Sequence, residues 1–437
     1  MQSEFHFQNI MLHRFLAALL VLVTLRSFAQ DTITVMHYNL LNYGNYTSYC
    51  TSANNNHEQK DVYIKTITDY IQPDIFTVNE ISEYEFYHNQ ILGNVLNTGG
   101  RRNYRKANLT NIASSYIING LYYNSDKFVL HKQYVAQSYI RDINVYSLYY
   151  RHSSLSQGDT TFLHCIVAHL KASSGSSNEQ ARATMASATI NWLQTNLKPG
   201  NFLMMGDFNL YTSEEAAYQH LTNPLPVNAA FRFYDPVDKP GDWNNNSQFA
   251  QWHTQSVSSQ GTSCQASGGM DDRFDFILAS AAVMQGAGNV KYVADSYWAV
   301  GQDGKHFNKS ITDSPANTSV PADVLNALAN NSDHLPVMLK LRINTGPVGI
   351  EDQLAGFGDA KIIYEDGEKF LKLFSPVNQK VTLRLISITG QELYSLNEFI
   401  QAGTQQIRLH TQLLPAGVYL VNLVSEKGKN VTLKLVN

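Results

Sequence analysis

The region from residue 32 to residue 343 alternates short apolar runs with polar stretches. The short runs have the length and the β-branched content that are typical of buried strands. Two longer stretches, residues 57–71 and 178–197, are predicted as helices, and each is followed by a proline and then by another strand-like run. Many strands with a few helices between them indicate sheets that are covered by helices.

The pattern changes after a linker that we place at residues 344–358. From residue 359 to residue 437 the chain consists of short alternating strands that are broken by turn residues such as Thr389-Gly390, and no helical period is present. This segment is predicted to form a small all-β sandwich. It holds no cluster of His, Asp or Glu, so we expect no catalysis from it.

Residues 1–30 are typical of a secretory signal peptide. His13 and Arg14 precede an apolar run from Phe15 to Leu25, and Ser27-Phe28-Ala29 places small residues where a signal peptidase reads. That run is too short for a spanning helix, and no other segment is long and apolar enough to cross a bilayer. We therefore expect an exported protein, secreted or at the cell surface, without a transmembrane segment, whose main domain covers residues 31–343.

The overall charge does not favour nucleic acid as a partner. Net charge is −4 and charged residues make up 16% of the chain, so any attraction for phosphate has to be local. One basic cluster occurs in GGRRNYRKANL, where Tyr104 lies among Arg101, Arg102, Arg105 and Lys106. This cluster either follows a phosphate backbone or forms a solvated loop.

The three cysteines lack the spacing of a zinc site. Cys165 lies within the apolar run FLHCIVAHL and is predicted to be a buried small hydrophobic residue. Cys50 and Cys264 lie in polar, loop-like stretches, where export permits a disulfide between them. The sequence leaves that pairing open.

Several apolar runs end in side chains that bind metals or transfer protons. They are Asn39 in HYNLLNYG, Glu80 in TVNEI, His169 in VAHLK, Asp207 and Asn209 in MMGDFNL, Asp275 in RFDFIL, and Asp333 and His334 in SDHLPV. Taken singly, most of these motifs have structural explanations such as turns, helix caps or core histidines. Together they predict one pocket that holds a hard divalent metal and handles phosphate.

Oxygen ligands are the first group in this set. A carboxylate at Glu80 and an amide oxygen at Asn39 suit Mg²⁺, which takes only one or two protein carboxylates, and Asp333 is a further candidate ligand. In GDFN, Asp207 is suited to orient or deprotonate a water molecule. Asn209 is suited to hold a phosphate oxygen without adding negative charge.

A proton-transfer pair is the second group. Asp275 and His334 are far apart in the sequence, but both stand at apolar runs. A carboxylate that is bonded to one imidazole nitrogen sets the tautomer and raises the basicity of the ring. His334 is therefore the candidate general base. His37 and His164 are interpreted as core histidines.

These motifs together resemble the endonuclease/exonuclease/phosphatase superfamily over about residues 32–343, with GDFN and SDHLPV the most specific and VNEI close behind. The resemblance implies an α/β fold, a four-layer α/β/β/α sandwich of the deoxyribonuclease I type, with the site at one edge of two packed sheets. It implies metal binding by Asn39 and Glu80, completed by Asp333, with Mg²⁺ as the ion and Mn²⁺ or Ca²⁺ as alternatives. The implied catalytic residues are His169, Asp207, Asn209, Asp275 and His334.

Two departures from the superfamily bear on the substrate. Ser82 stands where deoxyribonuclease I-like sequences carry an arginine for DNA, two residues after Glu80. In those nucleases a carboxylate pairs with the histidine at the position of His169, and the segment INGLYY offers none. DNA as the substrate is therefore less securely implied than the phosphodiester chemistry.

The C-terminal segment resembles the sorting domain of bacterial type IX secretion substrates. The likeness is carried by Ser375-Pro376, SITGQEL, LPAGVYLVNL and the closing TLKLVN. It implies export through the periplasm, recognition by the type IX secretion machinery and removal of the domain on export. A carbohydrate-binding or fibronectin-like module shares the strand pattern but not these motifs.

The function that we expect is a secreted, metal-dependent phosphodiesterase, a nuclease acting on nucleic acid. A sphingomyelinase-like lipid phosphodiesterase is the alternative, with Trp243 and Trp252 of the polar insertion at residues 239–269 as membrane anchors. A further alternative is a non-catalytic surface adhesin with the same fold. A serine-nucleophile elbow and a P-loop are both absent from the sequence.

Overall fold

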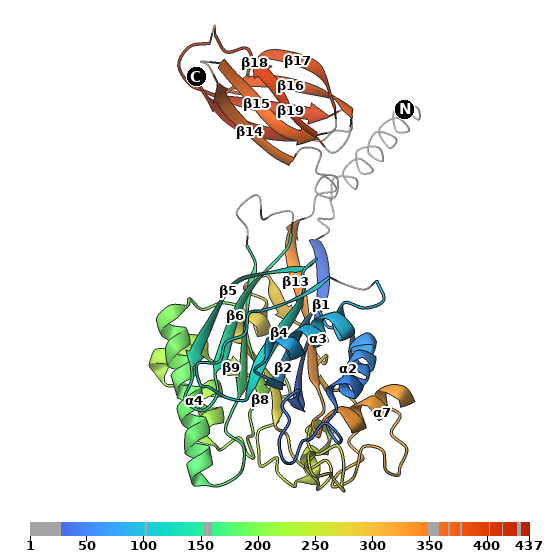
Figure 1. The fold of residues 1–437 in the computed structure, drawn as a ribbon. Helices are drawn as coiled ribbons and strands as arrows, with labels where there is room; N and C mark the ends of the chain where they lie inside the picture. The colour runs from blue at the N-terminus through green and yellow to red at the C-terminus, as the bar shows by residue number, and fades with distance from the viewer. Residues whose placement is uncertain are drawn as a thin grey trace, which may run out of the picture. The chain divides into compact units, whose positions relative to one another are not determined.

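The computed structural model forms two compact units, Gln30–Thr345 and Gly346–Asn437 (Figure 1). It describes residues 28–100, 103–152, 155, 160–347, 358–365, 368–375, 378–401, 403–412, 414–425 and 430–437. Most of the expected signal peptide and of the expected linker lies outside these residues.

The larger unit alternates strands and helices as the sequence pattern indicates. Its strands are β1 (Phe28–Tyr43), β2 (Ile75–Ser82), β3 (Tyr104–Lys106), β4 (Ile117–Asn124), β5 (Phe128–Gln137), β6 (Ile143–Tyr150), β7 (Phe162–His169), β8 (Phe202–Asp207), β9 (Phe233–Tyr234), β10 (Asp275–Ser280), β11 (Val290–Tyr292), β12 (Trp298–Ala299) and β13 (Val337–Pro347). Its helices are α2 (His57–Ile71), α3 (Glu85–Gln90), η1 (Ile91–Leu96), α4 (Ser176–Asn196), α5 (Ala216–Thr222), η3 (Pro226–Phe231), η4 (Ser247–Trp252), α6 (Ala281–Gln285) and α7 (Ala322–Asn331). Both long helices predicted from the sequence are present, as α2 and α4.

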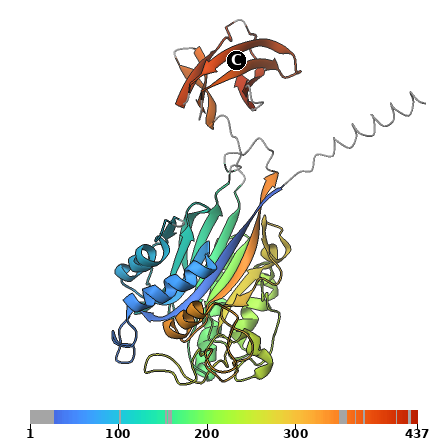
Figure 2. The ribbon, with the colours of Figure 1, turned by 90° about the vertical axis from the view of Figure 1, so that its right-hand side faces the viewer.

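Two sheets pack face to face in this unit. One has the order β11-β13-β1-β2-β4-β3, with β12 paired to β13, and the other has the order β5-β6-β7-β8-β10-β9. In the first sheet β1 and β2 run parallel, and in the second β7 and β8 do so. Figures 1 and 2 show α2 and α7 outside one sheet, and Figure 1 shows α4 outside the other.

The alternation of side chains along the strands explains the layers. In β1, Ile33 and Val35 belong to the apolar cluster between the sheets, whereas Met36 and Tyr38 belong to the cluster beneath α2 and α7. A third cluster joins the outer face of the second sheet to α4 and α5. The expected four-layer α/β/β/α sandwich is confirmed.

The smaller unit is all-β. It contains β14 (Gly358–Glu365), β15 (Glu368–Ser375), β16 (Gln379–Ser387), β17 (Glu392–Ile400), β18 (Gly403–Leu409), β19 (Val418–Ser425) and β20 (Asn430–Val436). They form a sheet of order β14-β15-β18 and a sheet of order β17-β16-β19-β20, with one apolar core that includes Leu371, Leu383 and Leu423. Among the residues described in both units, no helix is long and apolar enough to cross a membrane.

Candidate active site

Strand register brings the predicted site residues to one edge of the two sheets. In the first sheet Asn39 of β1 lies opposite Asn79 of β2, directly before Glu80. In the second sheet Asp207 of β8 lies between His169 of β7 and Asp275 of β10. The backbone N–H of Asp207 donates to Asn79 Oδ1 at 2.8 Å, which joins the two sheets at this edge.

Irregular backbone turns the side chains toward the site. Glu80, Asn42 and Asn209 have positive φ angles of 56°, 52° and 51°, a conformation that non-glycine residues adopt infrequently. The β1–β2 and β2–β4 pairings both shift register here, between Asn39 and Tyr43 and between Val78 and Ile81. Such irregularities re-aim side chains beside functional sites.

His334 forms a buried ion pair with Asp275. His334 Nδ1 lies 2.7 Å from Asp275 Oδ2, and Asp275 is fixed because its backbone N–H donates to Thr254 Oγ1. Burial by itself would lower the pKa of His334, and it is the largest single effect. The carboxylates of Asp275, Asp207 and Asp333 together hold that pKa well above its ordinary value.

Gln255 contacts the other imidazole nitrogen, and the sequence analysis did not single it out. Its side-chain Nε2 lies 2.8 Å from His334 Nε2 and donates to Asp333 Oδ2 at 3.3 Å. An amide nitrogen has no lone pair to offer, so this contact requires His334 Nε2 to be the acceptor and Nδ1 to carry the proton. Gln255 thus favours the neutral ring, whereas the carboxylates favour the imidazolium.

Asn39 ties the two central carboxylates together. Its Nδ2 donates to Asp207 Oδ2 at 2.9 Å and to Glu80 Oε1 at 3.2 Å, while its Oδ1 accepts from the Leu41 N–H. The sequence predicts that Asn39 offers its side-chain oxygen to a metal. In the structure this oxygen accepts from the Leu41 N–H, and the amide nitrogen faces the two carboxylates. Glu80 Oε2 is held in turn by the backbone N–H of Asn42.

A candidate metal centre is formed by Glu80, His169 and Asp207, whose ligand atoms all lie within 4.8 Å of one another. His169 Nε2 is 3.7 Å from Glu80 Oε1 and 3.5 Å from Asp207 Oδ2. Burial raises the pKa of Asp207 and, as the largest effect, lowers the pKa of His169 well below its ordinary value. A neutral imidazole beside two carboxylates can bind a cation but is a poor proton donor.

Asp333 does not belong to this group. Its Oδ2 accepts from the backbone N–H of Ala266 at 3.0 Å, and its Oδ1 lies 4.0 Å from His334 Nε2, buried and without a hydrogen-bond partner among the described residues. The expected metal set of Asn39, Glu80 and Asp333 therefore differs from the set that the register brings together.

Asn209 and Arg141 complete the polar edge. The Asn209 backbone N–H donates to Asp207 Oδ1 at 3.0 Å, and its side chain is buried. Arg141, in the loop between β5 and β6, donates from Nη1 to Leu170 O at 3.1 Å and interacts electrostatically with Glu80 and Asp207. Nothing in the local sequence marks this arginine, because only the β6–β7 pairing brings its loop beside His169.

A disulfide joins the loops on two sides of the site. Cys50 and Cys264, whose pairing the sequence left open, are bonded across a separation of 214 residues. Cys50 follows the β1 turn that contains Asn42, and Cys264 precedes Ala266, which contacts Asp333. Cys165 is buried and free, as expected.

His37, His164 and the segment INGLYY contribute to the framework around the site. His37 is buried against Thr77, its Nδ1 3.0 Å from Oγ1, and His164 lies 2.8 Å from Ser147 Oγ, so both belong to the framework. Within INGLYY, Asn119 joins the sheets by accepting from Asn79 and donating to Val167 O, and does not pair with His169.

Neither alternative substrate feature is free at the surface. Trp243 is fully buried and donates from Nε1 to Lys239 O, and Trp252 is half-buried beneath the Lys239 ammonium. The prediction of Trp243 as a membrane anchor is wrong, because its ring belongs to the core beside Tyr218.

The basic cluster is only partly described by the structure. Arg101 and Arg102 lie outside the described residues. Tyr104 is buried and Lys106 is paired with Glu85 at 2.7 Å. Their strand pairs with the half of β4 away from Glu80.

Comparisons with known proteins agree with the two parts of the chain. Residues 369–437 match the family model described as the secretion system C-terminal sorting domain. No curated protein matches the chain. A domain of this kind marks a protein for export by type IX secretion to the cell surface or outside.

Three solved structures that are similar to the chain share 11–14% identity with it. D. rerio TDP2 complexed with single-strand DNA product has 11% identity and a TM-score of 0.44, covering 71% of this chain and 99% of that chain. An endonuclease/exonuclease/phosphatase protein from Beutenbergia cavernae has 11% identity and a TM-score of 0.39, covering 93% and 100%. The human nocturnin catalytic domain with bound sulfate has 14% identity and a TM-score of 0.42, covering 72% and 96%.

At these identities the roles of individual residues have to be judged from the geometry of this chain. Residues 369–437 match the secretion system C-terminal sorting domain, and the solved structures to which the chain is similar include proteins of the endonuclease/exonuclease/phosphatase family.

Proposed function

We propose that residues 31–343 form the catalytic domain of a secreted, metal-dependent phosphodiesterase whose substrate is nucleic acid. The observation that carries the proposal is the meeting of the Asp275–His334 pair with a carboxylate–imidazole cluster at one buried edge. Each part has a structural explanation by itself. Their convergence supports the proposal, because hydrolysis of a phosphodiester requires a general base beside groups that are suited to hold a cation and phosphate oxygens.

The residues present fit a divalent cation. Glu80 and Asp207 offer carboxylate oxygens and His169 an imidazole nitrogen within 4.8 Å of one another, and a cation would offset the repulsion that helps to raise the pKa of Asp207. We assign the metal to these three residues, with Mg²⁺ as the expected ion and Mn²⁺ favoured if His169 is a ligand. When bound, the ion would supply positive charge toward the phosphate.

The protein's own groups supply the rest of the chemistry. His334 takes a proton at Nε2 from the attacking water once that water has replaced the Gln255 amide there, while the proton on Nδ1 stays in the hydrogen bond to Asp275 Oδ2. Asp275 stabilises the imidazolium that forms. Asn209 and the Arg141 guanidinium are suited to donate to phosphate oxygens on which charge develops. Water attacks in line with the phosphorus–oxygen bond that breaks, and the leaving oxygen departs with the bonding electrons and takes a proton from solvent.

Nucleic acid is favoured over phospholipid because the proposed lipid anchor is absent from the surface, Trp243 being fully buried. The adhesin alternative does not account for the buried carboxylates. Asp207 and Asp275 are almost inaccessible to solvent, and burial of carboxylates is costly, so that clusters of them are found mainly at functional sites.

The test uses the purified full chain with Mg²⁺ or Mn²⁺, with and without chelator. Plasmid DNA, a single-stranded oligonucleotide, bis(p-nitrophenyl) phosphate and sphingomyelin vesicles are assayed side by side. We expect chelator-sensitive cleavage of nucleic acid, reduced by about 10²- to 10⁴-fold in His334→Ala. His131→Ala, on the exposed side of β5, is the matched control. Release of phosphocholine without nucleic-acid cleavage, or full activity in His334→Ala, would contradict the proposal.

A further inference from the structure

Exposed aromatic side chains gather on loops at the active-site edge of the larger unit. We name this set the aromatic rim. It consists of Tyr46, Tyr49, Tyr84, Phe86, Tyr116 and Tyr139, with exposed fractions of 39%, 69%, 66%, 56%, 76% and 65%. Large exposed rings that gather in one region of a soluble protein indicate an interaction surface.

The topology places every member of the aromatic rim at the site end of a strand. Tyr46 and Tyr49 lie in the loop after β1, and Tyr84 and Phe86 follow β2, so both pairs come after the strands that carry Asn39 and Glu80. Tyr116 directly precedes β4, which pairs antiparallel with β2 through Ser82 and Ile117. Tyr139 lies in the β5–β6 hairpin, next to Arg141.

Contacts between these loops make the aromatic rim continuous on the β2–β4 side. The Glu83 backbone N–H donates to Tyr116 O at 3.3 Å, and Asn111 Nδ2 donates to Glu83 Oε2 at 2.8 Å. The carboxylate of Asp142 accepts from the backbone N–H groups of Ile112 and Ala113 at 2.8 and 2.9 Å. The loops that carry Tyr84, Tyr116 and Tyr139 are therefore held to one another.

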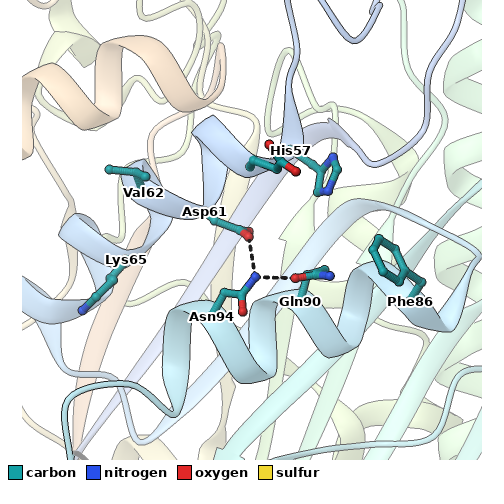
Figure 3. Close-up of a pocket in the computed structure, with 8 residues that line it drawn as sticks. His57, Asp61, Val62, Lys65, Phe86, Gln90 and Asn94 are labelled. Atoms are coloured by element: carbon teal, nitrogen blue, oxygen red, sulfur yellow. Dashed lines mark hydrogen bonds between the residues drawn. The ribbon is translucent and has the colours of Figure 1, made fainter.

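At its other end the aromatic rim meets a hollow between α2 and α3. Tyr46 Oη lies 2.7 Å from His57 Nδ1, and the His57 and Phe86 ring centroids are 6.2 Å apart. Figure 3 shows these two rings at one end of the hollow, with Asn94 to the side of them, hydrogen-bonded to Asp61 and to Gln90. The hollow has a volume of about 360 Å³, enough space for a planar ring.

The charges along the aromatic rim discriminate between nucleic-acid forms. Binding to duplex DNA depends on lysine and arginine contacts to many phosphates, but this surface presents Glu83 and Glu85, and Lys106 is engaged by Glu85. Arg141, Lys171 and the buried Lys60 are cations that interact electrostatically with residues of the candidate metal centre. Exposed rings with few cations suit bases that are unpaired, because stacking on an aromatic face requires the base to leave the duplex.

We propose that the aromatic rim stacks the unpaired bases of a single-stranded nucleic acid whose phosphodiester lies at the Asp275–His334 edge. This inference rests on the proposed function and names its substrate class. The rings supply affinity without reading base edges, so the preference is for strandedness rather than for sequence. Acidic side chains between the rings also disfavour an anionic lipid surface.

Binding is measured with the full chain carrying His334→Ala, so that the probe is not cleaved. The probes are a fluorescein-labelled oligothymidylate, its duplex with oligodeoxyadenylate, and fluorescent sphingomyelin vesicles. We expect the single strand to bind more tightly than the duplex, and Tyr84→Ala and Tyr116→Ala each to weaken single-strand binding by roughly 5- to 150-fold. Tyr84→Phe and Tyr116→Phe should restore most of it, because the stacking face remains.

The matched control is Tyr70→Ala, which removes a ring that is 43% exposed near the far end of α2. Equal losses in Tyr70→Ala, unchanged binding in Tyr84→Ala and Tyr116→Ala, or a preference for the duplex would overturn the inference. So would ring-dependent binding to the vesicles in place of the oligonucleotide.

A second readout separates this inference from the proposed function. In the chain with His334 intact, the ratio of kcat/KM for the oligonucleotide to kcat/KM for bis(p-nitrophenyl) phosphate should fall in Tyr84→Ala. Hydrolysis of the small ester with an unchanged ratio would refute the aromatic rim alone. Failure to hydrolyse any phosphodiester would refute the proposed function, whatever the binding data show.

Discussion

Removal of the Cys50–Cys264 disulfide should destabilise the larger unit and loosen its active-site edge. The two cysteines are separated by 214 residues in the sequence, so the bond removes a large amount of loop entropy from the unfolded chain. In the chain-entropy description a loop of this length corresponds to about 5 kcal/mol. For a unit of roughly 300 residues that amounts to a decrease in Tm of roughly 8 °C.

The assay is thermal unfolding of the Cys50→Ser/Cys264→Ser double variant beside the oxidised parent, with Cys165→Ala as the cysteine control. Activity should fall with stability, because the bonded loop supplies the Ala266 N–H to Asp333 and carries Gln255 at its start. A Tm within about 1 °C of the parent would refute the reasoning, since loop entropy of this size cannot vanish unless the unfolded chain is already constrained. Retention of full activity at lower Tm would instead refute only the link between the loop and the site.

Three further predictions concern charges at the site. Asp275→Asn should lower kcat by about a hundredfold or more. It should also lower the pKa of His334 in an NMR titration of metal-free protein, because Asp275 makes the largest contribution among the carboxylates that raise this pKa. An unchanged imidazole pKa would contradict the pairing. Burial lowers the pKa of Lys60 to about 7 from an ordinary 10.5. Between these two pH values Lys60 is protonated in the unfolded chain but neutral in the folded one, so the free energy of unfolding rises with pH. Denaturant unfolding should therefore show the parent gaining stability relative to Lys60→Met from pH 7 to pH 10, and parallel curves would exclude the shift. Arg141→Ala should reduce kcat/KM by roughly 10- to 150-fold with a partial recovery in Arg141→Lys, and equal activity of all three proteins would remove the guanidinium from the site.

Much of the framework follows from local sequence. Short β-branched runs that end in polar residues predict buried strands. The sequence also predicts a helix that ends before Pro73. The motifs around Asp207, Asp275 and His334 predicted one polar edge, and the structure brings these side chains together there. The β-sandwich of the C-terminal segment and its match to a sorting domain are likewise consistent with the pattern of turns and strands.

Tertiary structure decided which of those groups touch. The sequence predicted Asn39 and Asp333 as metal ligands beside Glu80. Asn39 does lie beside that carboxylate, but as a hydrogen-bond donor, and strand register adds His169 and Asp207 to the cluster, whereas Asp333 is not part of it. The orientation of the Asn39 amide depends on the Leu41 N–H and on two carboxylates that lie far away in the chain. No local pattern contains that information.

Loops account for the residues that the sequence did not reveal. Polar stretches without periodicity contain Arg141, Gln255 and the tyrosines of the aromatic rim. In such stretches the composition predicts neither which side chains are buried nor which residues they contact. Trp243 lies in such a stretch and still enters the core. Local sequence determines which segments form strands and helices because those preferences depend on neighbours along the chain. The contacts of loop side chains depend on strand pairings between residues hundreds of positions apart, and only the folded chain sets them.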